Sequence, residues 1–255
     1  MIDIHCHILH GVDDGPKTRT DSLAMAQAAV NEGIHTIIAS PHHQNGIYIN
    51  SRLDIEAKVM EFNRLMQEEN IPLTVLVGQE TRLHRDMIKE LQMGVITPLN
   101  NTKYVFIEFP SGEVPRYAEQ MLFEIQVAGY TPIIVHPERN RQIAENPSIL
   151  YNLVQKGSLT QLTAASIVGK FGKAIQKLSY QLIESNLTHF IASDAHNTTS
   201  RGFRLKEAYE KICKRYGDET FYMYMENARL LINGEDVYCY EPQNVKKQRK
   251  IFGVF

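Results

Sequence analysis

The segment IDIHCH at residues 2–7, within the opening stretch MIDIHCHILHGVDDG (1–15), begins the pattern that decides the fold. It is a short apolar run of the kind that forms a buried strand, and it ends in a His-x-His pair. Side chains two apart on a strand share a face, so we expect His5 and His7 side by side, with Cys6 pointing the other way. Two imidazoles on one face can chelate a cation, but one such pair is a weak signal.

Six further apolar, β-rich runs follow, at residues 35–40, 73–78, 104–109, 131–136, 159–164 and 189–194. Segments with helical spacing of apolar residues lie between and after them, at residues 20–32, 53–67, 117–128, 148–155, 169–185, 201–216 and 219–231. Strands that alternate with helices predict a parallel sheet covered on both faces. Seven such units favour a closed or nearly closed α/β barrel over an open sheet.

Composition is that of a globular protein, with 255 residues, 43% hydrophobic and 22% charged. No linker divides the chain, so we expect one barrel domain at residues 1–238 and a basic tail at 239–255. The tail carries Lys246, Lys247, Arg249 and Lys250, and we expect it to be solvated rather than a partner-binding arm. The net charge of −2 gives no reason to expect nucleic acid as the main partner.

The N-terminus does not resemble a signal peptide, since Asp3 interrupts its apolar run. No stretch approaches about 20 apolar residues, so we expect no membrane insertion. The cysteines Cys6, Cys213 and Cys239 show no pairing pattern. Reduced thiols and a cytoplasmic location are therefore expected.

Metal-ligand residue types stand at the ends of most predicted strands. After the His5–His7 pair come His42 in SPHH, Glu80 in VGQE, Glu108 in FIEFP, His136 in VHPERN, and Asp194 with His196 in SDAH. The carboxyl ends of parallel barrel strands form one rim, where α/β-barrel proteins place their sites. The repetition therefore predicts one metal centre rather than isolated polar strand ends.

Mixed histidine and carboxylate ligands favour Mn²⁺, Zn²⁺ or Fe over Ca²⁺ or Mg²⁺. So many ligands imply two or three ions that share a bridging carboxylate. His35 and His189 open strands and belong to the opposite rim, while His84, in a predicted helical segment, and His10, in a loop, are expected at the surface. His42 is preferred over His43, which would support it or be exposed.

The motifs HCH (5–7), DDG (13–15), SPHH (40–43), GQE (78–80), IEFP (107–110), HPERN (136–140) and SDAHN (193–197) together resemble the polymerase and histidinol phosphatase (PHP) superfamily. Within it, they are similar to the manganese-dependent tyrosine-protein phosphatases of Gram-positive capsular and exopolysaccharide operons. The resemblance covers about residues 3–205 and implies an α/β fold of the distorted (β/α)7, TIM-like barrel type with a trinuclear Mn²⁺ site.

The resemblance also implies three ligand sets: His5, His7, Glu80 and Asp194; Glu80, Glu108 and His136; and His42, His196 and an aspartate of DDG. We prefer Asp14 over Asp13 for that aspartate. Arg139 and Arg201 match arginines that bind the phosphate, with Arg141 a weaker candidate. The implied substrates are tyrosine-phosphorylated proteins, including the tyrosine kinase of the same pathway.

Such a site suits hydrolysis of a phosphate monoester, because a metal ion lowers the pKa of bound water to about 7 and so supplies hydroxide. Asp194 or a bound water could donate a proton to the leaving group. Cysteine-based phosphatase chemistry is excluded, since no cysteine stands in an H-C-x5-R loop. The alternatives are a small-molecule phosphatase such as histidinol-phosphate phosphatase, a PHP nuclease, and a non-catalytic metal-binding module.

Overall fold

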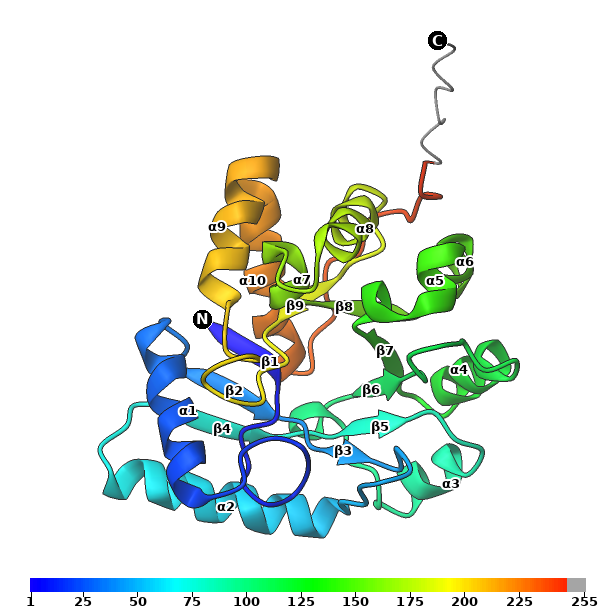
Figure 1. Ribbon diagram of the computed structural model, residues 1–255. Helices are drawn as coiled ribbons and strands as arrows, with labels where there is room; N and C mark the ends of the chain where they lie inside the picture. Colours follow the sequence, from blue (N-terminus) through cyan, green and yellow to red (C-terminus); the bar gives the residue numbers. More distant parts are fainter. Residues whose placement is uncertain (247–255) are drawn as a thin grey trace.

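The computed structural model describes residues 1–246, and every strand pair in it is parallel (Figure 1). One sheet has the order β1 (Ile2–Cys6), β2 (Thr36–Ala39), β4 (Thr74–Val77). The other has the order β3 (His42–His43), β5 (Glu80–Arg82), β6 (Tyr104–Glu108), β7 (Thr131–Val135), β8 (Leu159–Thr163), β9 (Phe190–Ala192). The predicted parallel α/β architecture is confirmed.

All seven predicted strands are present, and two of them resume after an interruption. β2 stops before Pro41, which has no backbone N–H to donate, and the chain pairs again as β3. β4 stops before Gly78, where a Cβ atom would lie 2.4 Å from the Ile38 side chain, and the chain continues as β5. These two short strands, which the sequence analysis did not predict, carry His42 and Glu80 into the site.

The two sheets approach each other between β9 and β1. The backbone N–H of His7 donates to Ala195 (2.9 Å), and that of Asp194 donates to His5 (2.9 Å). One isolated bridge, Cys6 with Ala195, accompanies these bonds. The described strands are thus arranged as a barrel that is joined here by single contacts, and they do not form one continuous hydrogen-bonded ring.

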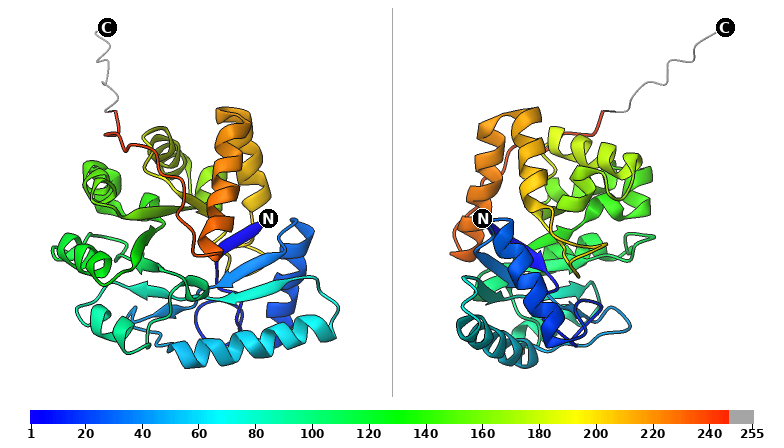
Figure 2. Two further views of the ribbon diagram at one scale, coloured as in Figure 1. Left: turned by 180° about the vertical axis from the view of Figure 1, so that it is seen from behind. Right: turned by 60° about the vertical axis from the view of Figure 1, so that its left-hand side comes forward.

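Helices cover the outside of the strands (Figures 1 and 2). They are α1 (Arg19–Asn31), α2 (Arg52–Glu68), α3 (Met87–Gln92), α4 (Ala118–Val127), α5 (Arg141–Glu145), α6 (Ser148–Gln155), α7 (Ala164–Val168), α8 (Lys173–Glu184), α9 (Leu205–Tyr216) and α10 (Asp218–Ile232), with 3-10 turns η1 (Leu99–Asn101) and η2 (Pro137–Arg139). The helix predicted at 169–185 begins only at Lys173, because Gly169 and Gly172 adopt φ of 91° and 94° and separate α7 from α8. The placement of His84 in a helix was wrong, since it precedes α3.

A bulge in β1 aims its histidines into the barrel. The pairing of β1 with β2 shifts register between Asp3 and Cys6. Ile4 belongs to the cluster that fills the barrel interior, and the His5 ring lies 4.9 Å from Phe106 of the same cluster. Cys6 instead packs in the outer core beneath the helices. The bulge therefore keeps two consecutive side chains on the inner face, which strict alternation would not allow.

The interior below the histidines is apolar. Its buried side chains come from the inner faces of the strands and from α10, and include Ile38, Tyr104, Phe106, Ile133, Phe190 and Leu231. This layer of buried side chains fills the barrel beneath the site.

The segment after α10 returns along the outside of the barrel. Asn227 and Tyr238 exchange two hydrogen bonds, the Asn186 side chain donates to Glu241 (2.9 Å), and the backbone of Gln243 donates to Ser185 (2.8 Å). The first part of the predicted tail is thus hydrogen-bonded to the turn that follows α8. Lys247, Arg249 and Lys250 lie outside the described residues, and the domain boundary at 238 stays a prediction. No helix in the described part of the chain is both long and apolar enough to span a bilayer.

His189 gives the fold a testable pH dependence. Burial lowers the pKa of its imidazole from 6.5 to about 4, and Nδ1 accepts a hydrogen bond from the Thr160 backbone. The unfolded chain therefore binds more protons between these two values, and the free energy of unfolding falls as the pH drops from 6.5 to 4, by up to about 1.4 kcal/mol per unit.

The variant His189→Asn keeps an acceptor for Thr160 and cannot titrate. Urea unfolding between pH 4 and 7 should show a shallower pH dependence for this variant than for the unmodified protein. The loop variant His10→Asn is the matched control. An unchanged slope in His189→Asn would contradict the assignment.

Candidate metal centre

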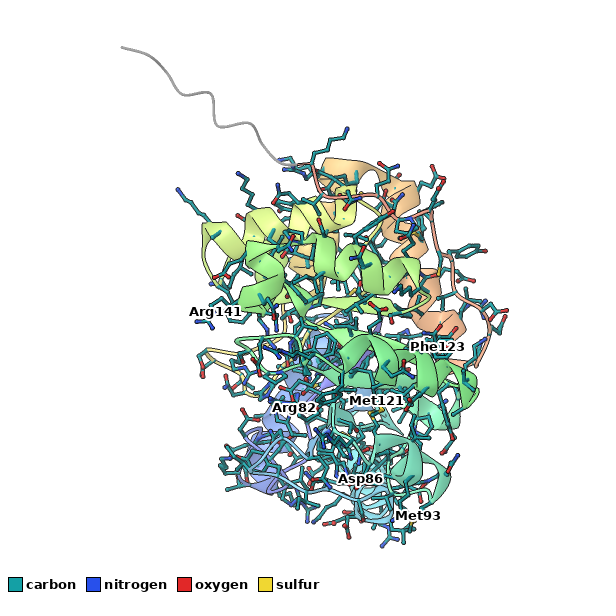
Figure 3. The ribbon with its side chains drawn as sticks, turned by 90° about the vertical axis from the view of Figure 1, so that its right-hand side faces the viewer. Arg82, Asp86, Met93, Met121, Phe123 and Arg141 are labelled. Atoms are coloured by element: carbon teal, nitrogen blue, oxygen red, sulfur yellow. The ribbon has the colours of Figure 1, made fainter. Side chains whose placement is uncertain are left out.

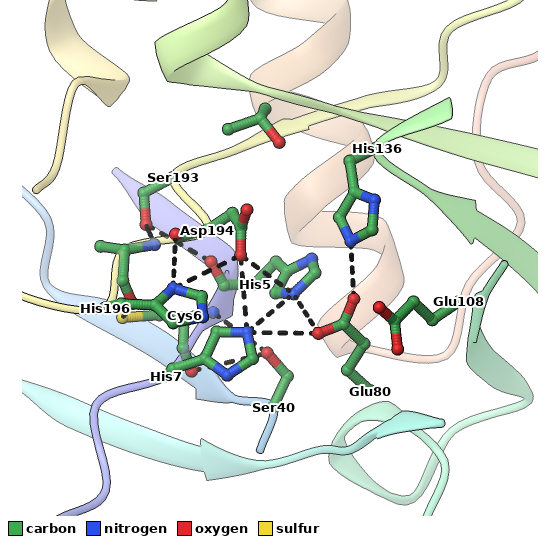
Figure 4. Close-up of polar contacts among 12 residues, drawn as sticks. His5, Cys6, His7, Ser40, Glu80, Glu108, His136, Ser193, Asp194 and His196 are labelled. Carbon is green, nitrogen blue, oxygen red and sulfur yellow. Dashed lines mark hydrogen bonds and ion pairs between the residues drawn. The ribbon is translucent and has the colours of Figure 1, made fainter. Parts of the chain in front are cut away.

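The side chains predicted as metal ligands gather at the carboxyl ends of the strands, and Figure 4 shows most of them. They form three overlapping groups whose potential ligand atoms lie within 4.8 Å of one another: His5, His7 and Glu80; His42, Glu80 and Glu108; and His7, Asp14, His42 and His196. Asp194 and His136 border these groups. The rim position follows from the parallel topology, since each residue ends or follows its strand.

The first group forms around the β1 histidines. Nε2 of His5 and Nε2 of His7 lie 3.4 and 3.3 Å from the same oxygen, Oε2 of Glu80. Asp194 Oδ1 lies 3.7 and 3.5 Å from these two nitrogens. Two imidazole nitrogens and two carboxylate oxygens thus face a common point, which is the ligand set that the family resemblance implies for one ion.

Glu80 connects the groups. Its Oε2 also lies 2.9 Å from His42 Nδ1, and its Oε1 lies 2.7 Å from His136 Nε2. Glu108 approaches His42 Nδ1 at 3.7 Å. The resemblance places Glu108 with His136, whereas the structure groups Glu108 with His42 and brings His136 to the other Glu80 oxygen. Either way, a single carboxylate spans two adjacent positions, as a bridging ligand does.

The third group depends on the DDG turn. Oδ1 of Asp14 lies 3.4 Å from His42 Nε2 and 3.2 Å from His196 Nε2. Asp13 faces the other way and holds His7 Nδ1 at 2.7 Å. A Cβ at Gly15 would lie 2.4 Å from the His7 backbone carbonyl, so the turn needs glycine at this position to pack against β1.

The unsatisfied atoms of the site fit a metal ion. His42 Nδ1, Glu80 Oε2 and His196 Nε2 are buried and lie near one another or near Asp14, but none of these contacts within the described part of the chain has the geometry of a hydrogen bond. Buried polar atoms without partners are costly and need an explanation. Divalent cations supply one, because neutral imidazole and carboxylate are ligands for such ions and no cysteine enters the site.

Supporting hydrogen bonds fix which nitrogen of each β1 histidine faces the centre. Asp13 holds Nδ1 of His7, and the Gln161 amide oxygen holds Nδ1 of His5 at 2.9 Å. In both rings Nε2 is therefore directed toward Glu80 and Asp194. Asp13 also accepts from the backbone of Gly15 and of His42, so one carboxylate ties β1, the DDG turn and β3 together. Such partners orient ligand histidines in metal sites.

The pKa shifts of four side chains in the cluster favour the protonation states that bind cations. Burial alone would raise the pKa of Glu80 and of Asp194, but the surrounding histidines and, for Asp194, Arg139 hold both well below their usual range. Burial lowers the pKa of His136 and of His196 to about 4, with help from Arg139 and His7, respectively. Both carboxylates are thus ionised and both imidazoles neutral at pH 7, the forms that bind metals.

Two ligand positions carry backbone strain. His136 and Asp194 adopt left-handed conformations, with φ of 36° and 52°. Non-glycine residues rarely occupy this region, and each instance costs on the order of 1–3 kcal/mol. His136 directly follows β7 and Asp194 lies two residues after the end of β9, and the strained turns keep their side chains directed into the barrel. Asp3 supports the second turn, since its carboxylate accepts from the backbone and hydroxyl of Ser193.

Arg139 and Arg201 converge beside the cluster. Arg139 approaches Asp194 at 2.8 Å, and Arg201 approaches Asp194 at 3.3 Å and Asp14 at 3.2 Å. Both line a cavity of about 450 Å³ that also exposes His42, Glu108, His136 and Asp194. Arg141 is not among the residues that line it, and its side chain points outward (Figure 3).

Three side chains near the site were not found by sequence analysis. Arg82 forms a two-pronged ion pair with Glu108 (3.0 Å for each bond), Gln161 orients His5, and Phe171 lies against the Arg139 guanidinium, 5.6 Å from its ring centre. Of these three, only Arg82 could have been predicted to lie near the site, because it stands two residues after Glu80. Gln161 lies inside a strand and Phe171 in a loop, and neither carries a ligand pattern.

The remaining histidines lie outside the cluster. His43 is buried and, with His84, contacts Glu90 of α3 at 3.3 and 3.2 Å. The Asn50 backbone donates to the other nitrogen of His43. His43 therefore supports the strand that presents His42. His35 and His189 precede β2 and β9 and lie at the opposite rim, as predicted.

By fold and site, the protein is of the class of parallel α/β proteins that build a histidine- and carboxylate-rich metal centre at the carboxyl ends of their strands. A family model described as "Capsular polysaccharide synthesis, CpsB/CapC" matches residues 1–233. The chain belongs to the CpsB/CapC family.

Individual relatives are similar along nearly the whole chain. Tyrosine-protein phosphatase YwqE of Bacillus subtilis is 49% identical over 255 residues, which is 100% of both chains. Tyrosine-protein phosphatase CpsB of Streptococcus agalactiae serotype III is 32% identical, over 91% of this chain and 98% of that one. A chain from the crystal structures of YwqE from B. subtilis and CpsB from Streptococcus pneumoniae, described as "unique metal-dependent tyrosine phosphatases", superposes with a TM-score of 0.95 at 48% identity, over 97% of this chain and 100% of that one.

Asp13 offers a test of the supporting hydrogen bonds. Asp13→Asn removes the charge that orients His7 and changes none of the ligand residues themselves, so Mn²⁺ affinity should fall by about 10- to 100-fold. Isothermal titration of metal-stripped protein measures this change. The surface variant Asp86→Asn is the control, and an unchanged affinity in Asp13→Asn would contradict the role of Asp13.

Proposed function

We propose that the protein is a metal-dependent protein-tyrosine phosphatase that hydrolyses phosphotyrosine on proteins. The observation that carries the proposal is that candidate metal-ligand residues and two arginines line the same cavity. The activities named for YwqE and CpsB, at 49% and 32% identity, support it.

The residues of the centre would hold the ions in the groups that the geometry brings together. We propose Mn²⁺ and two or three ions, because mixed imidazole and carboxylate donors suit this metal and Glu80 reaches two neighbouring positions. When bound, such ions supply Lewis-acid charge that polarises a phosphate ester and acidifies water.

The two guanidinium groups recognise the phosphate. Arg139 and Arg201 line the cavity, and no other arginine or lysine of the described residues lines it. Each guanidinium group presents several N–H donors in one plane. A phosphate monoester that enters the cavity replaces their contacts with Asp194 and Asp14 by charge-assisted bonds to its oxygens. Those bonds strengthen as negative charge develops in the transition state.

The leaving group explains why a tyrosyl ester suits this cavity. A tyrosine hydroxyl has a pKa of about 10, so the phenolate needs less protonation than a serine alkoxide. Asp194 is held as the ionised carboxylate by Arg139. It therefore acts here as a metal ligand and as a partner of the arginines, and the proton for the leaving group comes from water. Phe171, Val135 and Pro137 offer an apolar wall for the aromatic ring.

The biological partners follow from the family. We propose that the substrates are tyrosine-phosphorylated proteins of capsular polysaccharide synthesis, including the tyrosine kinase of the same pathway, and that the enzyme acts in the cytoplasm. The family description, which names capsular polysaccharide synthesis, supports the choice of substrates.

The decisive experiment measures phosphate release from a phosphotyrosine peptide and from histidinol phosphate, using metal-stripped protein with and without added Mn²⁺. We expect Mn²⁺-dependent turnover with a strong preference for the peptide. His136→Ala should reduce peptide turnover by at least about 10³-fold, because it removes a candidate ligand and also the imidazole that contacts Glu80 Oε1. His35→Ala, at the opposite rim, is the control. Preference for histidinol phosphate would replace this proposal with a small-molecule phosphatase.

Arg139 tests phosphate recognition. Arg139→Lys keeps the charge but loses the planar donor pair, so kcat/KM on the peptide should fall by about 10²-fold, with a larger loss in Arg139→Ala. Steady-state kinetics at saturating Mn²⁺ measure the change, and Arg141→Ala should retain the original rate. Equal kinetics for Arg139→Lys and the unmodified protein would assign the phosphate contact to another group.

A further inference from the structure

The connection between β3 and α2, residues 44–50 (QNGIYIN), is uncharged and exposes two large apolar side chains. The exposed fractions are 79% for Ile47 and 73% for Ile49. Isolated apolar side chains are ordinary on a surface. Here two of them flank Tyr48. Whether they could contact a substrate depends on where they lie relative to the metal centre.

The 44–50 loop lies next to the cavity. It directly follows β3, whose first residue, His42, both lines the cavity and belongs to two ligand groups. The Tyr48 ring lies nearly parallel to the His42 ring, at 9° and 6.3 Å between centroids. Because a strand-to-helix connection in a parallel barrel lies on the rim of the strand carboxyl ends, this loop borders the entrance (Figure 1).

The loop is held in place at both ends. The Asn45 side chain accepts from the backbone of Ile47 (3.0 Å) and of Tyr48 (2.9 Å). The Asn50 side chain donates to the carbonyls of His42 (2.8 Å) and Val12 (3.1 Å). The two isoleucines are therefore presented from an ordered turn attached to a metal-ligand residue. A preordered surface loses little conformational entropy when a partner binds.

We propose that Ile47 and Ile49 form a docking rim for the polypeptide that carries the phosphotyrosine, and that this rim favours apolar residues beside it. The inference rests on the proposed function and names the part of the protein substrate that the cavity itself cannot contact. A phosphotyrosine seated on Arg139 and Arg201 extends its backbone out of the entrance, across the adjacent rim. The loop offers that backbone no charge, so the flanking side chains that gain from contact are apolar.

The test uses three substrates and two variants. The substrates are p-nitrophenyl phosphate and two phosphotyrosine peptides that differ only in having leucine or serine on each side of the phosphotyrosine. The variants are Ile47→Ser/Ile49→Ser and, as a matched control, Val127→Ser. Val127 is 71% exposed, but it ends α4 and precedes β7, which places it at the opposite rim.

The unmodified protein should favour the leucine peptide over the serine peptide by about tenfold in kcat/KM, mainly through KM, as expected for a few apolar contacts. In the double isoleucine variant this ratio should fall close to one, while turnover of p-nitrophenyl phosphate stays unchanged because neither isoleucine lines the cavity. Val127→Ser should behave as the unmodified protein does.

Three outcomes would overturn the docking rim and leave the phosphatase intact: no peptide preference in the unmodified protein, a preference that survives in the double variant, or an equal loss on all three substrates. The last outcome would indicate a structural role for the loop. Absence of Mn²⁺-dependent turnover of every substrate by the unmodified protein would instead overturn the proposed function itself.

Discussion

The buried carboxylate of Glu80 is the constraint on which the rest of the site depends. Its Oε2 faces His5, His7 and His42, and its Oε1 faces His136. An ionised carboxylate excluded from water is tolerated only with close compensation, and these four histidines come from three different strands or strand ends: β1, β3 and β7. The barrel must therefore hold them rigidly, which explains why the centre is built on strand termini above an apolar interior.

The irregular backbone positions are concentrated where this centre needs them. The β1 bulge directs His5 inward after Ile4, and left-handed turns do the same for His136 and Asp194. Each departs from regular structure at some cost in stability, and hydrogen bonds accepted by Asp3, Asp13 and Gln161 hold the resulting geometry. Strain of this kind persists only where the surrounding structure fixes it, as a functional site does.

Chemistry and recognition come from different parts of the rim. Most of the candidate metal ligands lie at or near strand ends, whereas Arg139, Arg201 and the 44–50 loop lie on connections that follow the strands. Rigid elements fix the reacting groups, and loops can vary without disturbing them. The proposals for Arg139, Arg201 and the 44–50 loop would therefore place substrate selection on segments separate from the candidate metal ligands.

The sequence alone determined the seven parallel strands and the residue types at their ends, because apolar runs, helical spacing and strand-end histidines and carboxylates are local patterns. It also led to Asp14 rather than Asp13 and His42 rather than His43, which are the residues that the structure directs into the cluster. Only the tertiary structure decided the β1 bulge, the resumed strands β3 and β5, and the contacts of Arg82 with Glu108 and Gln161 with His5. Those features depend on which segments meet across the barrel. Local sequence patterns cannot predict them, because the residues that meet are far apart along the chain.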